Sequence, residues 1–404
     1  MAGTGITYKF EVAFGGSLEG LFRIGVSTVD GTDVISGWPA DVGYDDVTED
    51  TTAFAIRRGR SNDQAQLMAG TASFRLRDQS GKYNPANTSS PYYPNVVPFK
   101  VVRMTATYSG TEHPIFYGFI TNIVNNADPN RPITTFTCAD LFAWLSLRKP
   151  TISATGSTNT GAAIGAVLDE IEWPASFRDL DTGDSIDDFS ADGTKTSLSL
   201  IKGLLDAEMG QFYIAGDGKA TFKDRNARYA SLSSLSTIDG TSEALMQFQS
   251  TNSVATIFNA ATVTRDGGSA QSATNTDSIN AYGRRDMSAF TTSYVSTDAE
   301  ALARANLRVV RFKDPKTPAT ATMFSAPDTT AAMLARDFGD RVTINEPFQN
   351  TSDKDYFIES IGQSSQASAG VQRHVTQWRL SEVPAAAGIP VIINVTGIGN
   401  YIGA

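Results

Sequence analysis

The feature that most restricts how this chain can fold is a long proline-rich loop between amphipathic strands. Residues 71–78 alternate apolar and polar side chains, which is typical of a half-buried strand. The loop that follows, residues 81–98, can form neither a helix nor a central strand, because proline fixes φ and lacks an amide donor. Its prolines are Pro85, Pro91, Pro94 and Pro98. Alternation then predicts strands over 102–108 and 115–124, and this order indicates a β-barrel or sandwich.

Length and composition indicate a globular protein with more than one domain. The chain has 404 residues, and domains run about 100–200 residues each, so we expect two to four domains. Acidic residues outnumber basic ones by 43 to 33, which gives a net charge of −10. Because phosphate binding depends on clustered Lys and Arg, this balance argues against a dedicated nucleic-acid binding surface.

A single cysteine, Cys138, and two histidines, His113 and His374, limit the chemistry that the chain can support. One cysteine excludes an intramolecular disulfide, and two histidines leave little for a zinc or iron site. The N-terminus lacks the basic start and apolar run of a signal peptide, and no stretch approaches the roughly 18 apolar residues of a membrane helix. We therefore expect no metal, no cofactor, no membrane span, and folding in the cytoplasm.

The apolar pattern first gives a β region and then a small α+β region. Residues 1–148 keep a β pattern and are predicted to end in a short helix over 138–145. Residues 149–245 show helical spacing and are predicted to form a small helix and hairpin domain. The elements predicted there are helices over 164–171 and 198–205, a left-handed cap at Gly210, and a hairpin over 212–224.

Residues 246–385 return to β character around one predicted helix. Thr297 and Glu300 have the spacing of a capping box, and Pro315 ends the helix. The predicted buried stripe of this helix is Leu302, Ala305, Val309 and Phe312. The predicted strands are 258–264, 341–344, 356–361 and 371–380. Residues 386–404 are apolar and glycine-rich, so we expect them to form an extension that packs on a neighbouring chain.

An aspartate-rich loop over residues 181–192 is a candidate calcium site, since calcium prefers clustered carboxylate oxygens. Its acidic residues are Asp181, Asp184, Asp187, Asp188 and Asp192. The spacing does not fit an EF-hand loop, because Gly183 and Gly193 are misplaced and no closing glutamate follows. A solvated turn is the favoured interpretation.

No catalytic constellation is present in the sequence. Cys138 would need His113 or His374 as a base, but it lies in an alternating stretch where a buried thiol is the ordinary outcome. The glycine-rich stretches lack the Lys-Ser/Thr of a phosphate-binding loop. Paired carboxylates for glycoside hydrolysis have no specific support. We expect the chain not to be an enzyme.

Arg57, Arg58 and Arg60 form a basic cluster just before the first predicted strand. The cluster could contact phosphate, but no aromatic residues interleave the arginines for stacking on bases. Nearby carboxylates offer ion-pair partners, namely Asp45, Asp46, Glu49, Asp50 and Asp63. A salt-bridged turn or a subunit contact is therefore favoured over a nucleic-acid site.

Long segments of the chain resemble minor tail proteins of long-tailed bacteriophages, of the baseplate hub or distal tail-tip class. The first region contributes DDVTEDTTAFAIRRGRS, AGTASFRLRDQSGKYNPAN, SSPYYPNVVPFKVVRM and IFYGFITNI. Later segments are AIGAVLDEIEWPASFRDLDTG, LLDAEMGQFYIAGDGKATFKDR, TDAEALARANL, FGDRVTI and QWRLSEV. The resemblance covers nearly the whole chain in order, and the sequence departs most over its first ~45 residues and in its tail.

The resemblance implies a mainly β fold with an α+β insertion, in which two β-barrel-like domains are related to the fold of the tail tube protein. It implies a homotrimeric hub at the tail tip of the virion, assembled in the host cytoplasm, that joins the hexameric tube to tip or fibre proteins and gates the DNA channel. DNA would be cargo in the lumen, and a net negative charge suits a surface along which DNA slides.

We expect residues 81–98 to form a pre-ordered contact arm, since prolines lower the entropy that a loop loses on docking. The interface candidates are Arg57, Arg58, Arg60, Asn84, Pro85, Tyr92, Tyr93, Pro94 and Pro98. An alternative function is binding of a host-surface glycan, for which the 13 Tyr and 4 Trp could supply stacking faces. A wall-degrading enzyme is the less favoured third hypothesis.

Overall fold

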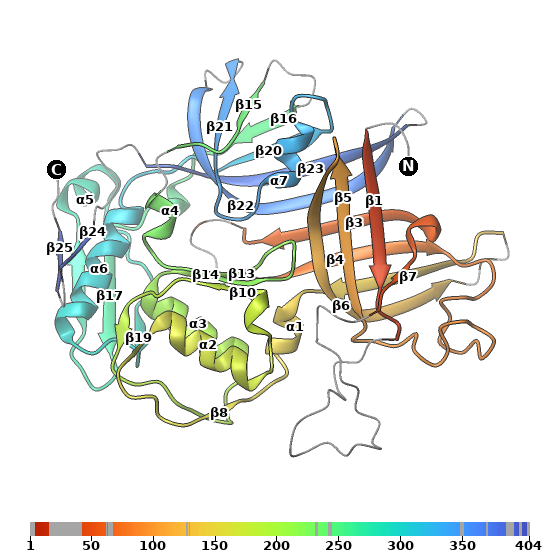
Figure 1. Ribbon diagram of the computed structural model, residues 1–404. Helices are drawn as coiled ribbons and strands as arrows, with labels where there is room; N and C mark the ends of the chain where they lie inside the picture. The colour runs from red at the N-terminus through yellow and green to blue at the C-terminus, as the bar shows by residue number, and fades with distance from the viewer. Residues whose placement is uncertain are drawn as a thin grey trace.

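The structure is a computed structural model, which describes most of the chain in the following residue ranges. These are 5–15, 43–61, 63, 68–126, 128, 130–230, 233–240, 245–347, 351–368, 371–384, 392–395 and 398–401. The fold is mainly β, with an α+β insertion, as the sequence predicts (Figure 1). Most of the first 45 residues and the start of the C-terminal tail lie outside the described ranges.

The first region is an antiparallel sheet that curls over itself. Its strands are β1 (Ile6–Val12), β2 (Asp45–Asp46), β3 (Thr51–Gly59), β4 (Met68–Arg77), β5 (Val101–Tyr108), β6 (Thr111–Asn126) and β7 (Ile133–Ala139). The strand order is β3-β4-β7-β6-β5-β1-β2. Phe10 of β1 stacks on Phe74 of β4 at 3.9 Å between ring centroids, so opposite ends of the sheet meet across an apolar interior. The strands predicted on both sides of the proline-rich loop are confirmed.

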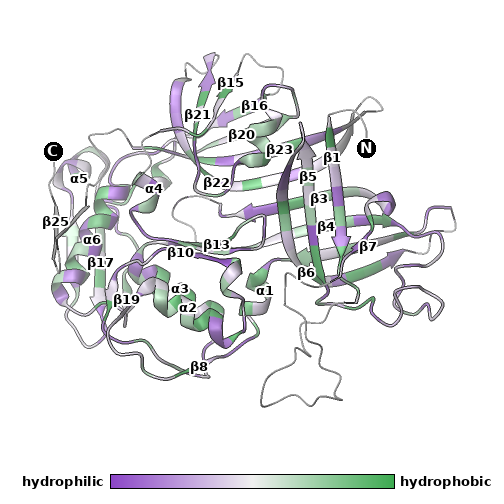
Figure 2. Cartoon of the chain, viewed as in Figure 1, coloured by the Kyte–Doolittle hydropathy of each residue, from purple (hydrophilic) through white to green (hydrophobic). Residues whose placement is uncertain are grey.

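Apolar and polar side chains alternate along these strands, which is why one face of the sheet is buried (Figure 2). In β4, for example, Ala72, Phe74 and Leu76 are buried, whereas Thr71, Arg75 and Arg77 are exposed. The short helix predicted over 138–145 begins later, because Cys138 is still paired with Ala72 inside β7. Helix α1 covers Leu141–Leu145, and the Asp140 carboxylate caps it by accepting the Phe142 amide.

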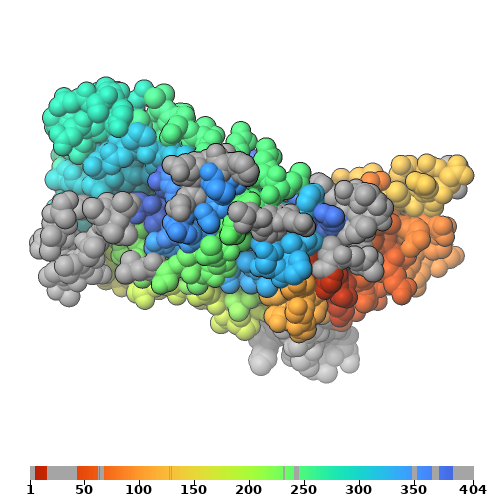
Figure 3. Space-filling view, turned by 90° about the horizontal axis from the view of Figure 1, so that it is seen from above, coloured from red at the N-terminus to blue at the C-terminus, as the bar shows by residue number. Residues whose placement is uncertain are grey.

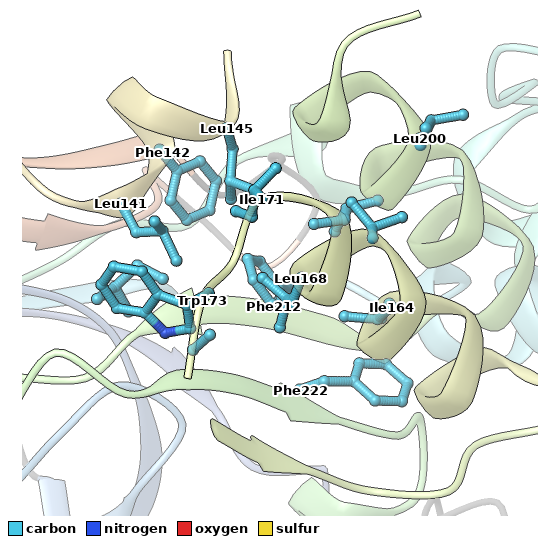
Figure 4. Close-up of a cluster of buried hydrophobic side chains, with 14 of the residues drawn as sticks. Leu141, Phe142, Leu145, Ile164, Leu168, Ile171, Trp173, Leu200, Phe212 and Phe222 are labelled. Carbon is cyan, nitrogen blue, oxygen red and sulfur yellow. The ribbon is translucent and has the colours of Figure 1, made fainter. Parts of the chain in front are cut away.

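The middle region packs two helices on a small sheet and shares its core with the first region. Its helices are α2 (Thr160–Glu170), α3 (Ser197–Glu208) and α4 (Ala227–Ala230). Its strands are β8 (Thr151–Ile152), β9 (Thr158–Asn159), β10 (Arg178–Leu180), β11 (Ser185–Ile186), β12 (Ala191–Asp192), β13 (Gln211–Ile214) and β14 (Ala220–Lys223). Figure 4 shows Leu141, Phe142 and Leu145 of α1 packed among Leu168, Trp173 and Phe212 of the middle region. The two regions are therefore joined by one apolar cluster.

Both helices and the hairpin predicted for the middle region are confirmed, but the predicted cap of the second helix is wrong. Met209, with φ +61°, is the left-handed residue that ends α3, and its amide bonds to the Leu205 carbonyl. The sequence predicts this conformation one position later, at Gly210, because glycine adopts it without steric cost.

The third region continues the sheet of the first. Its sheet strands are β15 (Thr237–Asp239), β16 (Leu245–Ser250), β20 (Ala319–Phe324), β21 (Arg341–Glu346), β22 (Thr351–Ser368) and β23 (Val371–Glu382), with α7 (Thr330–Ala335) nearby. Strand β22 pairs with β3 in register Ser360 to Gly59 and Ile361 to Arg58, so a single 13-stranded sheet runs through both regions. The domain limits predicted at residues 148, 245 and 385 stay predictions.

A small unit with a sheet of its own is inserted in the sequence between β16 and β20, which pair with each other. It consists of β17 (Ala260–Arg265), β18 (Gln271–Thr274), α5 (Thr276–Tyr282), β19 (Phe290–Thr292) and α6 (Asp298–Phe312). The sequence predicts its first strand as part of the second β domain and gives no sign of a separate sheet. A C-terminal hairpin, β24 (Ile392–Val395) and β25 (Ile398–Tyr401), follows beside α6. The contact with a neighbouring chain predicted for residues 386–404 stays a prediction.

The predicted N-cap of α6 is confirmed, because Thr297 Oγ1 accepts the Glu300 amide at 3.1 Å, whereas the Glu300 carboxylate accepts the amide of Ser296, one residue before the cap, at 2.9 Å. One member of its predicted buried stripe is wrong, since Leu302 is 38% exposed. The buried face begins at Ala301 and continues through Ala305, Val309 and Phe312. Alanine is small and gives a weaker apolar signal than leucine, so the first member of the stripe is predicted at Leu302, one position after Ala301, whereas the other three members are confirmed.

Candidate interface site

The proline-rich loop is ordered by a regular series of turns. Amides at every third position bond to the carbonyl three residues earlier, at 3.0 to 3.2 Å. The donors are Gly81, Asn84, Asn87, Ser90 and Tyr93. The side-chain oxygens of Asn84 and Asn87 each accept a hydrogen bond from the backbone amide two residues later. These bonds stabilise the same turns. These bonds hold the loop in defined turns up to Tyr93, which agrees with the pre-ordered arm expected from its prolines.

Tyr83 and Tyr92 anchor the loop to the first β region. Tyr83 is fully buried, and its hydroxyl donates to the Asp50 carboxylate at 2.6 Å. Burial raises the pKa of Tyr83 far above its usual range, so the phenol stays protonated. Tyr92 is partly buried and stacks on Phe14 at 4.1 Å between ring centroids. Lys82 also pairs with Asp50, at 3.1 Å.

The outer side of the loop is exposed and partly apolar. Tyr93 is 48% exposed and Val97 is 40% exposed, and Pro85, Pro94 and Pro98 are exposed as well. Asn84 is half-buried and acts in the turns. Seen from above, the atoms of the first β region project from the rest of the molecule (Figure 3). Of the predicted interface residues in this loop, Pro85, Tyr93, Pro94 and Pro98 are available to a partner.

The three arginines at the end of β3, Arg57 and Arg58 within the strand and Arg60 just after it, have different environments. Arg57 points to solvent, whereas Arg58 and Arg60 are each only 7% exposed. Arg58 Nη1 pairs with Asp337 at 2.7 Å and also lies 3.4 Å from the Ile214 carbonyl oxygen in the middle region. Arg58 and Arg60 form ion pairs, but with Asp337 and Glu359 rather than with the nearby carboxylates that the sequence suggested. A contact with another subunit can therefore involve Arg57, but not Arg58 or Arg60, which are buried.

Glu359 is the centre of a buried charge cluster that sequence reasoning missed. Its carboxylate accepts hydrogen bonds from Arg60 Nε at 2.7 Å and Arg228 Nη2 at 2.6 Å, and also from the Ser381 hydroxyl. Burial alone would raise the pKa of Glu359, but Arg228 and Arg60 outweigh it and lower the pKa to about 2. The cluster ties β3, α4 and the β22–β23 pair together. No signal in the sequence links residues so far apart.

The side chains considered for catalysis or metal binding form structural contacts within the chain. Cys138 is fully buried, and burial raises the pKa of its thiol, which disfavours the nucleophilic thiolate. His374 is buried, and its Nδ1 is hydrogen-bonded to the Tyr8 hydroxyl at 2.9 Å. In the aspartate-rich loop, Asp181 pairs with Lys223 and Asp184 pairs with Arg225 and Arg304. Among the described residues, no group of acidic, His or Cys side chains is arranged to hold a metal ion.

No described helix has the length and apolar character needed to cross a membrane.

Comparison with known proteins gives structural relatives only. No family model matches the chain, and no curated protein sequence matches it. The solved tail protein from Neisseria meningitidis MC58 has a TM-score of 0.60 at 11% identity, over 93% of this chain and 96% of that chain. The 43 kDa tail protein of prophage MuSo2 from Shewanella oneidensis has a TM-score of 0.57 at 15% identity, over 84% of this chain and 95% of that chain.

A third structural relative belongs to a larger assembly. A chain of the lidless PdpA–VgrG complex has a TM-score of 0.52 at 9% identity, over 93% of this chain and 64% of that chain. These likenesses span nearly the whole chain, and they show that it has the fold of phage tail proteins. The resemblance that the sequence predicts is thereby confirmed at the level of the fold.

Proposed function

We propose that this chain is a structural protein of a phage tail, part of the virion, and that three copies form a hub at the tail tip. In this proposal the hub joins the hexameric tube to tip or fibre proteins and gates the channel through which DNA leaves, without a catalytic step. The observation that carries the proposal is the match of almost the entire chain to tail proteins of similar length.

The arrangement of the two β regions supports the proposed match to a six-fold tube. Each chain brings two sets of strands, one on either side of the β3–β22 pairing, within one continuous sheet. Three chains would present six such sets. Closed rings of identical chains form when one surface meets a different surface of the next copy, and a rigid exposed arm suits such a contact. Residues 81–98 supply such an arm.

The loop supports an interface role because its outer side needs little ordering on docking. Its backbone is already held by turns, and Tyr83 and Tyr92 fix its inner side. A pre-ordered loop loses less conformational entropy when a partner covers it. We place the contact at Pro85, Tyr93, Pro94 and Pro98, with Arg57 as a further candidate on β3.

The oligomeric state tests the proposal. We expect the purified chain to show a mass about three times 43.2 kDa by light scattering at micromolar concentration. A stable monomer under all conditions, with no copies at the tube end of the particle, would contradict the hub. A monomer that nevertheless occurs at the tube end in three copies would support it.

A further inference from the structure

A cavity of about 150 Å³ lies where α3, α6 and the end of β3 meet, and it opens to the surface. Its apolar walls come from all three regions of the chain. The main wall residues are Phe142, Ile201, Leu205, Phe212, Met287 and Phe312. Phe142 and Phe212 lie 5.8 Å apart between ring centroids and belong to the cluster in Figure 4. None of the contacts proposed for the hub involves this cavity.

The volume of the cavity restricts what can fill it. Pockets for small-molecule ligands usually measure about 300–1,000 Å³, which is well above the value here. An apolar cavity of about 150 Å³ holds a group the size of a benzene ring. At protein interfaces, single apolar side chains that enter such pockets contribute much of the binding energy. The size therefore fits one large side chain carried by a peptide.

The charged groups around the cavity define what should accompany that side chain. Three of them have a partner inside the chain: Arg60 pairs with Glu359, Asp63 pairs with Lys316, and Arg311 donates to the Tyr229 hydroxyl. Lys202 and Arg308 remain, and neither forms an ion pair with a described residue. The lining holds four basic residues, Arg60, Lys202, Arg308 and Arg311, against two acidic ones, Asp63 and Asp206, so it carries an excess of positive charge in a chain whose net charge is −10.

Arg308 is the most unusual of these groups. Its Nε is buried and has no hydrogen-bond partner among the described residues, and its Nη1 lies 3.5 Å from the sulfur of Met287. The guanidinium stacks over Phe290 at 4.1 Å. Burial lowers the pKa of Arg308, and Asp206 partly offsets this effect. The Arg308 side chain as a whole is only partly buried, and its guanidinium forms no ion pair with a described residue, so it is available to a carboxylate, which can accept two of its hydrogen bonds at once.

We propose that this cavity is a docking site for an acidic–apolar peptide segment of a partner protein. One large apolar side chain of the segment enters between Ile201, Leu205 and Phe312. An adjacent carboxylate pairs with Arg308 and Lys202. The inference does not depend on the trimeric hub, because every residue that carries it lies within one chain.

Binding of fluorinated peptides to the full-length chain tests this site. The probe is Ac-Glu-(4-fluoro-Phe)-Glu-NH2, followed by ¹⁹F NMR titration, and the comparison probe replaces both glutamates by lysines. We expect the acidic peptide to bind at least about tenfold more tightly than the basic one. Equal affinity of the two peptides, or no binding of either, would overturn the proposal. So would binding of 3-phenylpropanoate without binding of the acidic peptide, since that assigns the cavity to free small acids.

Variants of the cavity locate the binding. We expect Leu205→Trp to abolish binding by filling the cavity, and Arg308→Met to weaken the acidic peptide about tenfold. Arg284→Met is the matched control, because Arg284 is exposed, pairs with Asp286 and does not line the cavity, and it should bind as the wild type does. Thermal melting checks the fold of each variant. If Arg308→Met does not fold, Lys202→Met provides the same test of charge, and unchanged binding in the folded variants would contradict the site.

Discussion

Arg60 and Glu359 form a buried ion pair, with 2.7 Å between Nε and Oε2, although 299 positions separate them in the sequence. The Arg60 amide also bonds to the Glu359 carbonyl oxygen at 2.7 Å, directly beside the β3–β22 pairing. The backbone and the side chains thus make the same connection between the first and third regions. The stability of the whole chain should depend on this junction.

The charge at the junction gives a first prediction. Glu359→Gln leaves Arg60 and Arg228 buried without a counter-charge, so we expect the free energy of unfolding to fall by about 3–5 kcal/mol. Urea denaturation measures the change. Asp286→Asn removes an exposed ion pair as a control and should cost less than about 1 kcal/mol. A similar small loss for both variants would contradict the structural role of Glu359.

The backbone at the junction gives a second prediction. Gly59 has φ +103°, and a Cβ there would lie 2.7 Å from Ser360 Cα and overlap the Glu359 carbonyl oxygen. We expect Gly59→Ala to destabilise the chain by at least about 3 kcal/mol, because conformational strain and a backbone clash add together. Gly110→Ala is the matched control, since Gly110 has φ +80° and open space around it. It should lose only about 1–2 kcal/mol. Equal losses would show that the close approach of β3 and β22 does not matter.

Much of the strand and helix content could be predicted from the sequence, because it depends on local patterns. Alternation located β4, β5 and β6, and the Thr297 capping box located the start of α6. The pairing of β3 with β22 could not be predicted, since no local pattern specifies a partner strand about 300 positions away. For the same reason Arg58 and Arg60 were matched with nearby aspartates and glutamates instead of Asp337 and Glu359.

His374 gives a third prediction, on pH dependence. Burial lowers its pKa to about 4, below the ordinary value of 6.5. Between these two values the unfolded chain binds a proton that the folded chain does not, so His374 costs stability as the pH falls from 6.5 to 4. The full loss is roughly 3 kcal/mol.

We expect His374→Phe to remove this loss of stability. The difference in unfolding free energy between variant and wild type should then change by roughly 3 kcal/mol between pH 6.5 and pH 4. We compare variant and wild type because Glu208 and Asp140, whose pKa values burial raises to about 7, affect the wild-type stability in the opposite direction as the pH falls. Their contribution is the same in both proteins and cancels in the difference. His113→Phe should change the slope less, because His113 is half-buried. A pH-independent difference for His374→Phe would refute this account of its environment.

The proline-rich loop gives a fourth prediction. Tyr93→Ala should leave the unfolding free energy within about 0.5 kcal/mol, because Tyr93 is 48% exposed. It should weaken self-association at least about fivefold if the loop docks on a neighbour. Sedimentation equilibrium measures both the mass and the association constant. Tyr83→Phe should have the opposite pattern of effects. It removes the hydrogen bond to Asp50 and should cost about 1 kcal/mol of stability, but it should leave self-association unchanged because the exposed side of the loop is the same.

A reconstruction of the tail end of the particle, with symmetry determined locally, tests the central proposal most directly. The account predicts three copies of this chain at the end of the tube, with residues 81–98 covered by a neighbouring subunit or by tube protein. A tail end that lacks this chain, or that holds it in another number of copies with residues 81–98 fully solvated, would contradict the account.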